Sequence, residues 1–225
     1  MIHRTAFIAL AGFLLALGVA LGQTVTLHKV EQDDPQVAFT HPMGFVFPAE
    51  VNGMPRGDII RYDADGKDIG STYKHASPSI TATVYVYPNP APKGKLESYF
   101  KQTAEEIASL PGIRHIKTEG ATIVGEFPAG QGGTDMKLLD TKKMAIALGK
   151  KKSEGYRALF SVSKPHSLAR NGEAVSEYYL FPLTESWLLK FRITYLAEDK
   201  EQAAPVIEKF LNGFAWPEKK SGSIK

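Results

Sequence analysis

The chain contains no cysteine among its 225 residues, and this single absence excludes several kinds of site. Disulfide bonds, zinc–thiolate centres, iron–sulfur clusters and thiol nucleophiles all require cysteine. Bacterial lipoproteins are acylated on a cysteine, so a lipid anchor of that type is excluded as well. A domain without such cross-links must be stabilised by its own hydrophobic core.

A strong charge of either sign is also missing. The formal net charge is +3 at pH 7, and it becomes +2 without residues 1–22, because Arg4 is the one charged side chain there. Proteins that bind nucleic acid are expected to have a strongly basic face, so we expect no nucleic-acid partner. Lysines cluster at 142–143 and 150–152, a pattern typical of solvent-exposed turns.

The sequence lacks the common motifs of catalysis, metal binding and cofactor binding. H-E-x-x-H, the phosphate loop, the dinucleotide fingerprint and the G-x-S-x-G elbow do not occur. The acidic turn at Asp63, Asp65 and Asp68 has Lys67 and Asp68 where a calcium loop requires an acid and a glycine. We therefore expect no catalytic residue, no metal and no cofactor, although a site assembled from distant residues would not be visible as a motif.

What the sequence does contain is an export signal. A short basic start with Arg4 precedes residues 6–22, which include no charged side chain, and small residues follow the apolar stretch. We predict cleavage between Gly22 and Gln23, and a cut after Ala20 is the weaker alternative. A retained signal anchor and an internal helix are the other readings of this segment. The predicted location is periplasmic or secreted.

The remaining chain is expected to form one domain, residues 23–217, followed by a polar flexible tail at 218–225. Residues 24–36 are acidic and are predicted to be irregular, and short strand candidates follow, among them 59–62. The clearest strand is 79–87, in which Ile80, Ala82, Val84 and Val86 alternate with Thr81, Thr83, Tyr85 and Tyr87.

The second half continues this order of strands and helices. An amphipathic helix is predicted at 95–110, and a long hairpin at 176–196 has its turn at 184–186. The form of 136–148 is left undecided. A final helix carries Val206, Ile207, Phe210, Leu211 and Phe214 on one stripe, and Pro205 is expected in or near its first turn. The fold class predicted is α+β: a single domain with a mainly antiparallel sheet and helices packed on it.

This order of elements resembles the PsbP-like fold, an α/β/α sandwich found in extrinsic photosystem subunits and a small nuclear-transport factor. Residues 80–88 also resemble exported bacterial proteins of unassigned function. The resemblance implies a non-catalytic protein that binds or helps to assemble something larger, and it assigns no functional residue. It is carried by Phe45, Phe47 and Pro48 at the start of the strands, the helix after Tyr87, the hairpin around Thr184, and the end at Trp216 and Pro217.

The polar side of strand 79–87 is either a wet binding surface or a face covered by a helix. If a helix covers it, the rim residues Tyr73, His75 and Tyr87 are the candidates for a ligand edge. The function expected is an exported, non-catalytic binding or assembly module of the cell envelope, with another protein or envelope component as its partner. The alternatives are a periplasmic enzyme, a hydrolase with a site not visible as a motif, and an envelope protein held in the membrane by its uncleaved N-terminus.

Overall fold

The computed structural model describes residues 24–30, 33–91, 93–109, 114–119, 122–126, 136–149, 151–162 and 172–215. The predicted signal segment with Gly22 and Gln23, the glycine-rich segment 129–134 and the predicted tail 218–225 lie outside the described residues. None of the helices in these ranges is both long enough and apolar enough to cross a membrane.

Ten strands follow one another in an antiparallel sheet, in the order β10-β11-β12-β13-β7-β6-β5-β1-β9-β8, and β4 pairs with β5 beside this path. Strands β2 and β3 form a separate pair. The prediction of an α+β fold with a mainly antiparallel sheet is confirmed. The elements are β1 (Thr24–Lys29), β2 (Phe39–Thr40), β3 (Val46–Phe47), β4 (Glu50–Val51), β5 (Met54–Arg61), β6 (Ile69–His75), β7 (Ile80–Pro88), α2 (Leu96–Ser109), β8 (Arg114–Glu119), β9 (Thr122–Glu126), β10 (Met136–Leu148), β11 (Lys151–Val162), β12 (Ala174–Thr184), β13 (Trp187–Leu196), the 3-10 helix η2 (Ala197–Asp199) and α3 (Lys200–Leu211).

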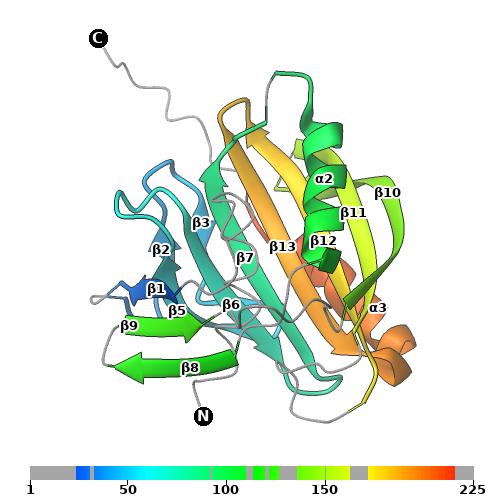
Figure 1. Ribbon diagram of the computed structural model, residues 1–225, viewed down its shortest axis with the longest axis horizontal. Helices are drawn as coiled ribbons and strands as arrows, with labels where there is room; N and C mark the ends of the chain where they lie inside the picture. Colours follow the sequence, from blue (N-terminus) through cyan, green and yellow to red (C-terminus); the bar gives the residue numbers. More distant parts are fainter. Residues whose placement is uncertain are drawn as a thin grey trace.

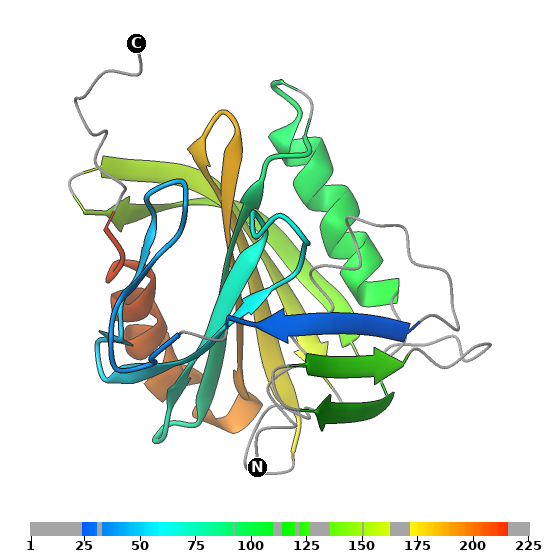
Figure 2. The ribbon, with the colours of Figure 1, turned by 90° about the vertical axis from the view of Figure 1, so that its left-hand side faces the viewer.

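Helices α2 and α3 lie on opposite sides of the long central strands, as Figures 1 and 2 show. The side chains of β7 explain this placement, because alternate residues of a strand point to opposite faces. Ile80, Ala82, Val84 and Val86 belong to the core that includes the α3 residues, which we call the α3-side core. Tyr85 and Tyr87 belong instead to the core beneath α2, which we call the α2-side core.

The α3-side core is rich in aromatic rings. Phe210 and Phe214 meet edge to face with their ring centroids 5.2 Å apart, and Phe191 of β13 contacts both. The α2-side core is built around Phe100, whose ring stacks on Tyr178 of β12 at 5.3 Å. Edge-to-face and offset-stacked pairs of this kind add to the free energy gained by burying their area.

Two predictions about local structure need correction. Residues 24–29 form strand β1 rather than an irregular segment, and β1 pairs with β9 and β5. Its hydrogen-bond partners lie far away in sequence, so the short apolar pattern did not reveal it. Pro205 is the sixth residue of α3, further in than expected, because the helix already begins at Lys200. Packing of Ile207 and Phe210 against the sheet offsets the hydrogen bond that proline removes.

His41 joins the chain before β3 to the acidic turn between β5 and β6. Its side chain is 1% exposed, Nε2 lies 3.0 Å from the Lys67 carbonyl oxygen, and Nδ1 accepts from the Met43 N–H at 3.1 Å. Its ring also lies edge-on to Trp187 at 5.1 Å. This arrangement requires the neutral ring with the proton on Nε2.

Acid is expected to weaken the fold through His41. Burial lowers the pKa of His41 below its ordinary value of 6.5, so its contribution is complete above pH 6.5 and is lost as the pH falls through the lower value in the folded state. Protonating Nδ1 removes the bond from Met43, at a cost of about 1 kcal/mol. The difference in urea midpoint between the wild-type protein and H41Q should therefore shrink from pH 8 to pH 5, and taking the difference cancels the pH dependence of other groups such as Asp68 and Lys190. A difference that stays constant over this range would show that His41 does not cause the acid sensitivity.

Candidate functional site

The α2-facing side of four neighbouring strands, β6, β7, β13 and β12, carries an unusual number of buried polar side chains. The strand register arranges the residues of this side in three rows that cross the sheet; Leu180 and Gly70 are their non-polar members, and Lys74 is exposed. We call this surface the cationic face, after the two cations at its centre, Lys190 and Arg192. From β12 to β6, the rows are Leu180, Lys190, Tyr85 and Gly70; Tyr178, Arg192, Thr83 and Thr72; and Ser176, Thr194, Thr81 and Lys74.

Arg192 is 2% exposed and has few partners for its guanidinium group. Nη2 donates to Ser176 Oγ at 3.3 Å and lies 3.7 Å from Met136 Sδ, while Cζ lies 5.6 Å from the centre of the Phe160 ring. Nε and Nη1 have no hydrogen-bond partner. Among the described residues, no ion pair includes Arg192. Burial lowers the pKa of this guanidinium, although it keeps its charge.

Lys190, two residues before Arg192 on β13, is 4% exposed. Its Nζ lies over the Tyr85 ring at 3.8 Å and 5.1 Å from the centre of the Tyr87 ring, so the tyrosine faces stabilise the ammonium group. Burial lowers the pKa of Lys190 to about 7, and the nearby Asp68 carboxylate opposes that shift. Burial likewise raises the pKa of Asp68 to about 7.

Hydroxyl groups surround the two cations. Thr194 donates to Ser176 Oγ at 3.2 Å, and the hydroxyl oxygens of Thr72 and Thr83 lie 3.3 Å apart. Hydroxyl groups can donate to an anion and accept from a cation, so this part of the sheet can solvate charge without bulk water.

A buried acid on the opposite face shows how a polar group is satisfied elsewhere in this fold. Glu177 is 5% exposed and accepts hydrogen bonds from Arg157 Nε at 2.8 Å, from Tyr195 at 2.7 Å and from Tyr179. This network has its charge paired and its oxygens occupied, which is the normal condition of buried polar groups. Arg192 lacks such partners, so the cationic face differs from a structural network.

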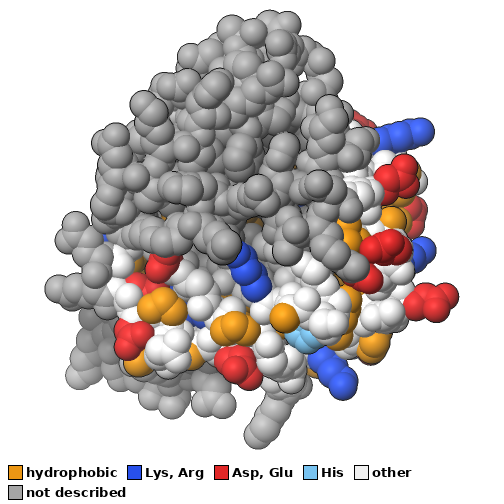
Figure 3. Space-filling model, turned by 90° about the horizontal axis from the view of Figure 1, so that it is seen from below, with side chains coloured by type: hydrophobic (Ala, Val, Ile, Leu, Met, Phe, Trp, Pro, Cys, Tyr) orange, Lys and Arg blue, Asp and Glu red, His pale blue; other side chains and the backbone are white. Residues whose placement is uncertain are grey.

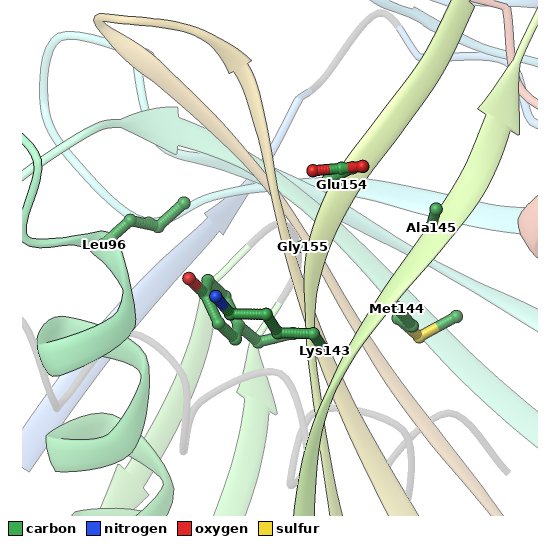
Figure 4. A pocket seen from close by; sticks show the side chains of 7 residues that line it. Leu96, Lys143, Met144, Ala145, Glu154 and Gly155 are labelled. Atoms are coloured by element: carbon green, nitrogen blue, oxygen red, sulfur yellow. The ribbon is translucent and has the colours of Figure 1, made fainter.

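A groove of about 500 Å³ opens between the start of α2 and the β10–β11 pair. In Figure 4, Lys143 extends from β10 toward α2, and Leu96 extends from the helix over the same space. Partly exposed Glu97 pairs with Lys101 at 2.9 Å and with Lys143 at 3.6 Å beside the groove. The other residues that line the groove are Met144, Ala145, Glu154, Gly155 and Tyr156. Its charges compensate one another, so it favours no particular ligand.

The three residues predicted as a ligand edge do not come together. Tyr73 is fully buried in the α3-side core, where its hydroxyl donates to the Pro48 carbonyl at 3.0 Å. Tyr87 lies on the opposite side of the sheet, beneath Lys190. His75 is partly exposed, with Nδ1 3.0 Å from the Pro78 carbonyl oxygen. Tyr87 alone contacts the cationic face.

Sequence reasoning missed Lys190 and Arg192 because their alternation with apolar neighbours on β13 is typical of a solvent-exposed side. One prediction could have revealed them: the alternative interpretation of β7, in which a helix covers the polar side of that strand. Tyr85 and Tyr87 share a core with Phe100 and Ala104 of α2, so a helix covers that end of the strand, and Thr81 and Thr83 are at most 4% exposed. Their partners on β13, Lys190, Arg192 and Thr194, are buried with them, whereas Lys74, which pairs with Thr81 on β6, is exposed.

The carboxylates of the acidic turn make their hydrogen bonds and ion pair within the turn itself. Asp63 Oδ1 accepts from the backbone N–H groups of Lys67 and Asp68 at 2.8 and 3.0 Å, and Asp65 pairs with Lys67 at 3.0 Å on the surface. Gly66 has a φ of +65°, as a tight turn requires. Within the described ranges, no group of three or more histidine, aspartate or glutamate side chains could hold a metal ion.

Comparison with family models and curated proteins gives no information about the site. No family model matches the chain, and no curated protein matches it. The surface seen from below in Figure 3 has acidic, basic and apolar side chains interspersed among the described residues. The described residues on that view form no patch of a single charge or of apolar side chains, and the buried cationic face is the candidate site.

Proposed function

We propose that this chain is an exported, non-catalytic binding or assembly module of the bacterial cell envelope, and that its ligand is held on the cationic face. The observation that carries the proposal is the burial of Lys190 and Arg192 side by side on β13, with two guanidinium nitrogens unpartnered. The apolar segment at residues 6–22 supports export. The placement of α2 and α3 on opposite sides of the sheet supports the α/β/α sandwich of the PsbP-like type.

The energetic argument favours a ligand over a purely structural role. A buried charge without a partner destabilises a protein by several kcal/mol, and an apolar side chain of similar volume would avoid that cost. The surroundings of Arg192, including Phe160 and Met136, would accept such a side chain. Costly polar groups of this kind are concentrated at sites of binding or catalysis.

Native mass spectrometry of the exported protein tests this function. We expect full-length chain expressed in a Gram-negative host to be recovered from the periplasm with an N-terminus at Gln23. The native spectrum should show an envelope component bound without a covalent bond, and R192M should lose it. R61M is the matched control, because Arg61 is exposed on β5 of the same sheet. Bare protein, with no thermal shift in envelope extracts, would refute the binding role, and intact Met1 in the membrane fraction would favour the anchored alternative.

A periplasmic hydrolase is the second candidate, and the surroundings of Lys190 favour it. An amine with a pKa of about 7, placed near a carboxyl group, is suited to general acid–base work. If this candidate is correct, generic ester or amide substrates should be hydrolysed with a rate that rises through pH 7, and K190M should abolish that rate. Absence of turnover in the wild-type protein would leave the binding module as the better account.

A further inference from the structure

We infer that the cationic face binds a carboxylate with an apolar body, and that this carboxylate forms an ion pair with Arg192. The inference rests on the proposed binding function and names the chemical class of its ligand. Three observations support it: the state of the guanidinium donors, the charge balance around them, and the side chains that surround them.

The guanidinium donors of Arg192 are only partly occupied. On the end edge of the guanidinium, Nη1 has no partner, while Nη2 has only a hydroxyl at 3.3 Å and a sulfur at 3.7 Å. A carboxylate matches the spacing of two guanidinium nitrogens and accepts two parallel hydrogen bonds from them. Ser176 and Thr194 lie beside this edge and can support the same oxygens.

The charge balance indicates a single negative charge. Lys190 and Arg192 are the two buried cations of the face, and Asp68 is the acid that acts on Lys190. Lys190 and Asp68 both have a pKa of about 7, so at pH 7 this pair carries no net charge on average. Arg192 keeps its positive charge, which leaves an average excess of +1 at that pH. A monoanion neutralises this excess, whereas a dianionic phosphate would leave a buried negative charge.

The surroundings indicate the rest of the ligand. The Phe160 ring and the Met136 sulfur both contact Arg192, and Phe160 belongs to the α2-side core with Phe100 and Tyr178. A carboxylate bound at Arg192 would therefore have aromatic and thioether groups next to its carbon skeleton. Such walls favour an aliphatic or aromatic body over a sugar or a polyol.

The test measures the binding of three probes that have the same octyl tail. The protein is the full-length chain recovered after export, and the method is isothermal titration calorimetry. We expect octanoate to bind roughly 10- to 100-fold more tightly than octan-1-ol, because one charged pair distinguishes them. Octyl phosphate at pH 8 should bind more weakly than octanoate. R192M should remove the preference for octanoate over octan-1-ol, S176A should reduce it, and R61M should leave it intact. Equal binding of octanoate and octan-1-ol, or a preference that survives in R192M, would overturn the inference.

A carboxylate of the chain itself is the other possible source of this chemistry, and thermal unfolding without ligand separates the two. If the site awaits an external carboxylate, R192M should unfold at a higher temperature than the wild-type protein. If an internal acid already pairs with Arg192, R192M should unfold at a lower temperature, and the inference would be wrong. S176A keeps the test usable if R192M does not fold. Retention of an envelope component together with equal binding of the probes would reject the ligand class and leave the binding function standing.

Discussion

The R56A variant is expected to lose about 3 to 5 kcal/mol of unfolding free energy, the usual cost of breaking a buried ion pair. Arg56 Nη2 and Nη1 bind the two carboxylate oxygens of Asp33 at 2.7 and 2.8 Å, and both side chains are almost completely buried. Removing the arginine leaves the Asp33 carboxylate in a dry site with one remaining bond, from the Ile59 N–H at 2.9 Å. Urea unfolding of the mature chain at pH 7 measures the loss.

The same substitution should loosen the segment before β2. Arg56 Nη2 also donates to the carbonyl oxygens of Asp34 and Val37, both at 2.9 Å, so it ties this segment to β5. Amide hydrogen exchange near Val37 should therefore accelerate in R56A, while R61A, which changes an exposed arginine at the end of β5, should behave like the wild-type protein. A loss below about 1 kcal/mol would place this pair among ordinary surface salt bridges.

Local periodicity predicted most of the elements that lie under the site. The alternation in 79–87 predicted β7, the patterns on both sides of residues 184–186 predicted the β12–β13 hairpin, and the stripe in 95–110 predicted α2. These signals are local, since the residues that create each pattern are neighbours in the chain. Strand β10 was left undecided because lysines interrupt its apolar positions, and pairing with β11 defines it.

The candidate site depends on contacts that no local pattern contains. Whether Lys190 and Arg192 are exposed depends on which helix packs over β13, and α2 lies about ninety residues earlier in the sequence. The prediction of Tyr73 and Tyr87 as one ligand edge has the same origin. Tyr73 pairs with Ala82 and Tyr87 with Leu188, so their side chains belong to opposite faces of the sheet.

The pair formed by Lys190 and Asp68 is expected to give the fold a stability minimum near pH 7. The pKa of Asp68 rises from 3.8 to about 7, and that of Lys190 falls from 10.5 to about 7, in both cases because burial penalises the charged form. Between pH 3.8 and 7 the folded pair holds one proton more than the unfolded pair, so stability falls as the pH rises. Between pH 7 and 10.5 it holds one proton fewer, so stability rises again.

Each of these two changes in stability, the fall below pH 7 and the rise above it, should amount to about 4 to 5 kcal/mol, since each pKa changes by a little more than three and one pKa unit corresponds to roughly 1.4 kcal/mol. The other charged or titratable groups that act on this pair are Arg192 beside Lys190 and Asp63 beside Asp68, together with the rings of Tyr85 and Tyr87 under the ammonium group.

Substitutions separate the fall in stability below pH 7 from the rise in stability above it. K190M should remove the rise above pH 7, and D68N should remove the fall between pH 4 and 7, because each takes away the group whose proton count changes on unfolding. The double variant should be more stable than the wild-type protein at pH 7. K74M is the matched control, since Lys74 is an exposed lysine at the end of β6 on the same side of the sheet. Guanidinium midpoints from pH 4 to 10 measure all four proteins, and a wild-type curve with its maximum near pH 7 would show that the tyrosine rings and Asp68 keep Lys190 fully charged.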